Sequence, residues 1–172
     1  MFGLFKNKRA PQGPVHFDLG AEFACPAQDV YALIDWASPH NTKRQLGHEV
    51  MPVVGIKGRF RMILNSLPDH MFELQEIGAD PGRHYAYVCE ILPPFGALVR
   101  TSESFQIEPL GNTSCKVTVR TEATFEEGMT YKDFQQEVMV MASACQSALE
   151  KLRIQAEHGT DALRAVETKL VL

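Results

Sequence analysis

The fold is decided by the stretch TYKDFQQEVMVMASACQSALEKLRIQAEH, residues 130–158, which contains no proline and no glycine. Its apolar side chains recur at three- and four-residue intervals, a spacing that is typical of one amphipathic helix. Thr130 suits the N-cap of this helix, and Gly159 suits the position just after its last turn. At about 1.5 Å per residue the helix would be roughly 40 Å long, enough to cross a sheet. We expect it to pack on that sheet through Val138, Met141, Ala142, Cys145 and Leu149.

Upstream of this helix, the sequence predicts seven strands. They cover 15–23, 48–54, 59–65, 71–77, 84–92, 98–108 and 114–125, with the alternation of half-buried strands. Short turns separate the last six, as in an antiparallel meander. A helix begins at Pro26, and a second short helix or loop covers 38–45. The sequence therefore predicts an α+β fold, a curved seven-stranded antiparallel sheet around a long C-terminal helix, with two short helices after the first strand.

The chain length of 172 residues suits one domain. We expect residues 1–14 to be a flexible N-terminal arm, 15–158 to be the domain and 159–172 to be a C-terminal tail with weak helical spacing. The arm joins apolar residues to a basic cluster at 6–9. A weak membrane-surface contact through residues 1–9 is therefore an alternative to a flexible terminus.

Composition argues against several classes of function. The formal net charge is −4 and only Lys6, Lys8 and Arg9 cluster, so nucleic-acid binding is not expected. The four cysteines are far apart and form no C-x-x-C pair, which indicates a reducing, cytoplasmic location without structural zinc. Neither a Gly-rich phosphate loop nor a metal motif occurs, so no metal and no cofactor are expected. The apolar runs are too short for a transmembrane segment.

Three segments resemble the START-like superfamily, whose members have the helix-grip fold. The segment ACPAQDVYALIDW, residues 24–36, resembles its opening, in which a strand runs into a Pro-initiated helix. The matching residues are Pro26, Ala27, Val30, Tyr31, Leu33, Ile34 and Asp35. EIGADPGRHYAYV, residues 76–88, resembles one of its hairpins, and LEKLRIQAE, residues 149–157, is similar to the end of its last helix. The likeness covers about residues 15–158 and is greatest for the bacterial polyketide cyclase/dehydrase and lipid-transport branch.

The resemblance implies a START-like ligand-binding domain over residues 15–158, with a cavity between the sheet and the last helix. It implies no single function, since the superfamily includes lipid carriers, hormone receptors, aromatase/cyclases, oxygenase domains and co-chaperone activators. One departure concerns the mouth of the cavity. Many members carry a Trp before the second strand, whereas residues 40–46 have none and Trp36 is the only Trp of the chain.

Strand alternation assigns the side chains that face such a cavity. On the strand 98–108 it turns Val99 inward, and the Pro-rich turn 93–97 places Phe95 at the rim with Trp36. Apolar walls with a few directional polar groups are typical of small-molecule sites. The predicted ligand-binding residues are Trp36, Phe60, Met62, Phe72, Tyr85, Tyr87, Cys89, Phe95, Thr101, Glu103, Phe105, Thr121, Val138, Met141 and Cys145.

Glu103 is the most unusual of these residues. A carboxylate on an interior face costs free energy unless it is paired, protonated or wet. Together with the tyrosines and threonines of the same face, it would form a polar spot in an apolar cavity. Two alternatives stay open: a β-bulge that reverses the register of this strand, or a place at the open end of the sheet, in water.

These observations support three functional hypotheses. The leading one is binding of a small hydrophobic molecule, such as a lipid, a polyketide-like compound or an aromatic compound. The first alternative is a polyketide cyclase or dehydratase that uses Glu103 as acid/base and Tyr85 or Tyr87 to hold an enolate oxygen. The second is a non-catalytic protein-interaction module whose interior is filled by side chains. Sequence leaves the ligand, any reaction and the oligomeric state open.

Overall fold

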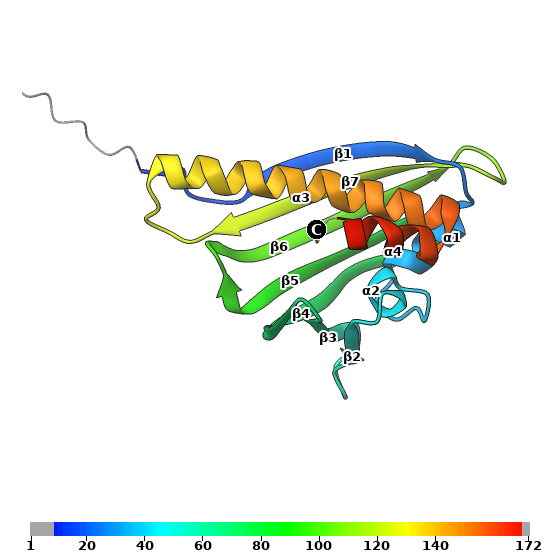
Figure 1. The fold of residues 1–172 in the computed structure, drawn as a ribbon, viewed down its shortest axis with the longest axis horizontal. Helices are drawn as coiled ribbons and strands as arrows, with labels where there is room; N and C mark the ends of the chain where they lie inside the picture. Colours follow the sequence, from blue (N-terminus) through cyan, green and yellow to red (C-terminus); the bar gives the residue numbers. More distant parts are fainter. Residues whose placement is uncertain (1–8, 170–172) are drawn as a thin grey trace, which may run out of the picture.

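The computed structural model describes residues 9–169 and confirms the predicted arrangement of one curved sheet and one long helix (Figure 1). Within these residues the sheet has seven strands in the order β1-β7-β6-β5-β4-β3-β2, all antiparallel. The strands are β1 (Val15–Phe23), β2 (Glu49–Pro52), β3 (Arg59–Leu64), β4 (Leu67–Asp80), β5 (His84–Phe95), β6 (Leu98–Pro109) and β7 (Cys115–Phe125). The helices are α1 (Ala27–Ile34), α2 (Thr42–Gln45), α3 (Tyr131–His158) and α4 (Thr160–Lys169).

The first and last strands of the chain, β1 and β7, lie side by side at one edge of the sheet. Every residue of β1 is paired with a residue of β7. The register joins Val15 to Ala123 and Phe23 to Cys115. On the outer face of this pair, the Arg120 guanidinium lies 2.7 Å from the Asp18 carboxylate. Both side chains are more than half exposed, so the ion pair adds little stability beyond the backbone ladder.

Helix α3 is unbroken, as predicted, and both of its ends are capped. The Thr130 hydroxyl accepts a hydrogen bond from the Asp133 N–H at 3.2 Å. Gly159 ends the helix with φ at 87°, a conformation that favours glycine. The helix lies along β1 and β7 and contacts α1 and α4 near its C-terminal end (Figure 1).

The buried part of α3 is its C-terminal half, where Cys145, Leu149 and Leu152 are buried. Val138 and Met141 are only half-buried, and the expectation that Ala142 packs on the sheet is wrong, because Ala142 is exposed. The helix rests on the β1–β7 side of the sheet, so the buried stripe is narrower than the apolar spacing predicts.

The inner face of the sheet follows the predicted alternation with one exception. Tyr85, Cys89 and Phe105 are buried as expected, but Val99 is 38% exposed. A β-bulge shifts the pairing of β6 with β7 between Leu98 and Arg100, so Leu98 packs inward and Val99 turns outward. The alternation resumes at Thr101, which is buried.

Three strands, β2, β4 and β5, differ from their predicted bounds by more than one residue. β4 begins at Leu67, ahead of 71–77, and β5 continues to Phe95. The prolines in β5 are tolerated because its pairing with β6 is irregular between Glu90 and Phe95. β2 covers only Glu49–Pro52 of the predicted 48–54.

The two terminal segments differ in how much the structure describes. The N–H of Ala10 donates to the Met129 carbonyl at 3.2 Å, so the chain is joined to the turn before α3 from that point on. Residues 1–8 of the predicted flexible arm, which are nearly all of the proposed membrane-contact segment 1–9, lie outside the described residues. Residues 160–169 of the predicted tail form α4, which turns back beside α3 (Figure 1). Among the described helices, none is long and apolar enough to cross a bilayer.

Candidate functional site

A cavity of about 540 Å³ lies between the inner face of the sheet and the C-terminal half of α3. Its sheet wall consists of Leu19, Tyr87, Glu103, Phe105, Val119 and Thr121. Its wall on α3 consists of Met141, Ala144, Cys145, Ser147, Ala148, Leu149, Lys151 and Leu152. The remaining walls come from α1, from α2 with its flanking residues, and from α4, through Leu33, Ile34, Trp36, Asn41, Thr42, Lys43, Leu46, Leu163 and Glu167. The short side chains on α3 explain why this space between helix and sheet stays unfilled.

Seven of the predicted ligand-binding residues line this cavity: Trp36, Tyr87, Glu103, Phe105, Thr121, Met141 and Cys145. The other eight lie outside its lining: Phe60, Met62, Phe72, Tyr85, Cys89, Phe95, Thr101 and Val138. Most of these occupy the inner face of the sheet but are packed into the core beside the cavity. Tyr85, for example, is fully buried against the Tyr31 ring, and its hydroxyl accepts a hydrogen bond from the backbone N–H of Trp36.

The two predicted rim residues have different positions. Trp36 lines the cavity, and its ring meets Tyr87 edge-on with centroids 5.3 Å apart. Its Nε1 is buried and has no hydrogen-bond partner within the described residues. Phe95 is 51% exposed and packs on the His70 ring. It belongs to the β5–β6 hairpin, at the opposite end of the sheet from α1, α2 and α4 (Figure 1), so its assignment to the rim of this cavity is corrected.

Strand register brings Glu103 together with Tyr87 and Thr121. Glu103 pairs with Tyr87 of β5 on one side and with Thr121 of β7 on the other, so the three side chains share one face. The bulge in β6 ends before this point, and Glu103 is half-buried in the cavity wall instead of lying in open water. The predicted polar spot therefore exists, with Tyr85 and Thr101 outside it.

Burial raises the pKa of the Glu103 carboxyl above its ordinary value. The hydrogen bond from the Tyr87 hydroxyl and the positive charge of Lys43 act in the opposite direction and are weaker. Burial also raises the pKa of Tyr87 well above the usual range for a phenol. Both Glu103 and Tyr87 therefore keep their protons to a higher pH than they would on an exposed surface.

The cavity thiol is not activated as a nucleophile. Burial raises the pKa of Cys145, and its hydrogen bond to Thr121 offsets only part of this shift. Burial likewise raises the pKa of Cys89, outside the cavity, to about 12. Reactive thiols have a lowered pKa, so neither cysteine has the electrostatics of a catalytic one.

A second polar group lies in the cavity around Lys43, a residue that is not among the predicted ligand-binding residues. Lys43 is held in place because Asn41 joins the end of α1 to the start of α2. The buried Asn41 side chain donates to the carbonyls of Ile34 and Asp35 and accepts from the Lys43 N–H at 3.0 Å. The next residue, Arg44, donates to the carbonyl of Trp36 at 3.0 Å and fixes the same loop.

Helix α4 closes this end of the cavity. Leu163 is fully buried, and the Glu167 carboxylate lies 2.6 Å from the Lys151 ammonium on α3. The Arg164 guanidinium donates to the Gln45 carbonyl at 2.7 Å, so α4 is joined to α2 as well. Glu167 was not predictable from the sequence, because the helical spacing of the tail is weak and nothing in it indicates which way the tail turns.

The comparisons with known proteins agree on the fold. No family model and no curated protein matches the chain. Among solved structures, the di-domain ARO/CYC protein BexL of the BE-7585A biosynthetic pathway is 15% identical over 86% of this chain, with a TM-score of 0.61. The match takes in 46% of BexL, so this chain spans about half of that protein.

Two further structures match along most of their own length. A protein from Arthrobacter aurescens is 19% identical over 87% of this chain and 86% of its own, with a TM-score of 0.57. A START superfamily protein from Mycobacterium smegmatis is 12% identical over 81% of this chain and 99% of its own, with a TM-score of 0.51. The chain therefore has the START-like, helix-grip fold that the sequence predicted. At these identities the likeness extends to the fold alone.

Proposed function

We propose that the protein binds a small hydrophobic molecule in the cavity between the sheet and α3. The observation that carries this proposal is the cavity itself, a space of about 540 Å³ with mainly apolar walls and a few polar groups. A volume of this size is within the range of ligand sites, and such a lining both desolvates a ligand and orients it. A fold shared with an ARO/CYC protein and a START superfamily protein supports the same class of function.

The test is to fill the cavity from α3 while leaving the core intact. Ala144 and Ala148 line the cavity with short side chains, so replacing both with Trp would occupy space that no residue uses. The neutral probe N-phenyl-1-naphthylamine is expected to bind the natural protein, and the double variant should lose at least about tenfold in affinity. Ala142→Trp is the matched control, because Ala142 is as exposed on this helix as Ala144 and Ala148 are but does not line the cavity. Equal binding by all three proteins, or no binding to the natural protein, would contradict the proposal.

A cyclase or dehydratase activity is the second candidate, and one observation favours it. Glu103 lies in the cavity wall opposite Tyr87, and burial raises its pKa, which suits a group that exchanges protons near neutral pH. Glu103→Gln keeps the shape of the side chain and removes its proton. For an enzyme, this variant would lose turnover of a poly-β-ketone substrate while still binding the neutral probe. For a simple carrier, it would change neither measurement.

A further inference from the structure

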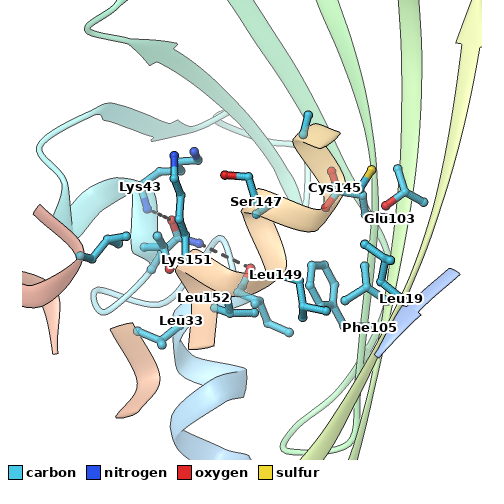
Figure 2. Close-up of a pocket in the computed structure, with 18 of the residues that line it drawn as sticks. Leu19, Leu33, Lys43, Glu103, Phe105, Cys145, Ser147, Leu149, Lys151 and Leu152 are labelled. Carbon is cyan, nitrogen blue, oxygen red and sulfur yellow. Dashed lines mark hydrogen bonds between the residues drawn. The ribbon is translucent and has the colours of Figure 1, made fainter. Parts of the chain in front are cut away.

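Two ammonium groups and one carboxylate come together at the α2–α4 end of the cavity. Lys43 comes from α2, Lys151 from α3 and Glu167 from α4. Figure 2 shows the two lysine side chains lying side by side, with their nitrogen ends on the same side of the cavity and the Ser147 hydroxyl directed toward them. Glu167 binds Lys151 at 2.6 Å, whereas Lys43 has no ion-pair partner within residues 9–169. This end of the cavity therefore carries one positive charge in excess.

The carboxylates near Lys43 do not offset the effect of burial on its ammonium group. Burial lowers its pKa most, and the neighbouring Lys151 charge lowers it further. Glu167 and Glu103 raise it, but Glu167 is already bound to Lys151, and burial favours the neutral form of Glu103. A half-buried charge without an ion pair is costly, and a bound anion would remove part of that cost.

An apolar wall leads away from the two lysines. Leu152 and Leu149 follow Lys151 toward the sheet on α3, and Phe105 and Leu19 continue the wall (Figure 2). Glu103 and Cys145 lie on the other side of the picture from the lysines. A molecule that filled the cavity would thus meet cations at one end, apolar side chains along its body and the Glu103–Tyr87 pair beyond.

We infer that the ligand of this cavity is an amphipathic acid. Its carboxylate lies between Lys43, Lys151 and the Ser147 hydroxyl, and its apolar body lies on Leu149, Leu152 and Phe105. This inference rests on the proposed binding function and deepens it, because it names the class of ligand. The chemistry that matters is an anionic head on an apolar body, which an alkyl acid and an aryl acid both have.

The test compares acids with neutral molecules of the same shape, by displacement of N-phenyl-1-naphthylamine near neutral pH. The pairs are decanoic acid with decanamide, and 2-naphthoic acid with 2-naphthamide. At least one acid should bind about tenfold or more tightly than its amide, as charge-assisted hydrogen bonds to a lysine allow. The pair with the larger ratio of acid affinity to amide affinity shows whether the ligand has an alkyl or an aryl body. Lys43→Gln should abolish the preference and leave the affinity for the amides unchanged, whereas Lys43→Arg should keep most of it.

Lys57→Gln is the control, because Lys57 is exposed in the turn before β3 and does not line the cavity. It should preserve the preference for the acid. Equal affinity for acid and amide, while both displace the probe, overturns the inference and leaves the proposed function standing. A preference that survives in Lys43→Gln overturns the role of Lys43. Failure of the probe itself to bind is a failure of the proposed function.

Discussion

At the scale of single residues, Glu103 combines an ordinary backbone position with an unusual environment. It sits in a regular stretch of β6, paired on both sides, and its side chain enters the cavity because of strand alternation alone. Its folded-state pKa is raised by burial, whereas in the unfolded chain it is expected near the ordinary value of 4.5. The folded protein therefore binds this proton more tightly than the unfolded chain does.

The pH dependence of stability should report this difference. As pH rises above about 4.5, the unfolded state loses the Glu103 proton before the folded state does, so this group lowers the free energy of unfolding. The penalty grows until the folded pKa is passed and then stays constant. Glu103→Gln removes it, so the variant should gain stability relative to the natural protein across that interval. Urea denaturation at a series of pH values measures the gain. A difference independent of pH, or equal to that for the exposed control Glu127→Gln, would contradict the buried-acid account.

The sequence could predict Glu103 in the cavity but not Lys43. Alternation along a regular strand fixes which side chains share a face, and it holds for Glu103 because the bulge of β6 lies earlier, at Val99. Lys43 belongs to a four-residue helix, which is too short to show a period. Its position depends on hydrogen bonds from Asn41 to the end of α1. Those bonds are tertiary contacts, and no local pattern encodes them.

At the scale of elements, α3 is held mainly by its C-terminal half. Leu149 is 6% exposed and belongs to the main hydrophobic core. Leu149→Ala should cost about 2–5 kcal/mol of unfolding free energy, because it deletes buried methyl groups and enlarges an existing cavity. Gln146→Ala, at an exposed position of the same helix, should change it by less than about 0.5 kcal/mol. Urea denaturation measures both, and a small loss for Leu149→Ala would mean that the helix is not anchored there.

The junction between α3 and α4 depends on the backbone of Gly159. A Cβ at this position would meet no atom within 4 Å, so only its φ of 87° opposes a side chain. With ψ at 173°, this conformation is one that almost only glycine adopts, so Gly159→Ala should cost about 1–3 kcal/mol of unfolding free energy. Gly111 has equal space around it and no positive φ, so Gly111→Ala is the matched control and should be neutral or slightly stabilising. Similar changes for the two variants would contradict a role for backbone conformation at Gly159.

At the scale of the whole molecule, α4 connects the helices that enclose the cavity. Glu167 binds it to α3, and Arg164 binds it to α2. Arg164→Ala removes the contact with α2, so a probe bound in the cavity should dissociate several-fold faster, because a charge-assisted hydrogen bond that restrains α4 is lost. Stopped-flow release of N-phenyl-1-naphthylamine measures this rate. Arg153→Ala should leave it unchanged, since Arg153 pairs with Glu150 within α3. Equal rates for the two variants would show that α4 does not limit release.

The overall architecture was predictable because it depends on repeated patterns, seven alternating strands and one long amphipathic helix. The extent of the cavity was not. It depends on where the core packs tightly, as around Tyr85, and where short side chains such as Ala144 and Ala148 leave space. The assignment of Phe95 fails for a related reason. Strand alternation shows which face of the sheet a residue lies on, but it does not show at which end of the sheet the cavity lies.

The pairing of β1 with β7 also determines when the chain can fold during its synthesis. β1 ends at Phe23, and β7, its one neighbour in the sheet among the described residues 9–169, begins at Cys115. At the usual pace of translation, the ribosome needs roughly 5–20 s to make the intervening residues. Helix α3, which packs on β1, is made later still. The apolar face of β1 is thus without its partners while the residues between β1 and β7 are made. Completion of the domain must wait until β7 and α3 have left the ribosome, and a chaperone that holds nascent apolar segments would find a target in β1.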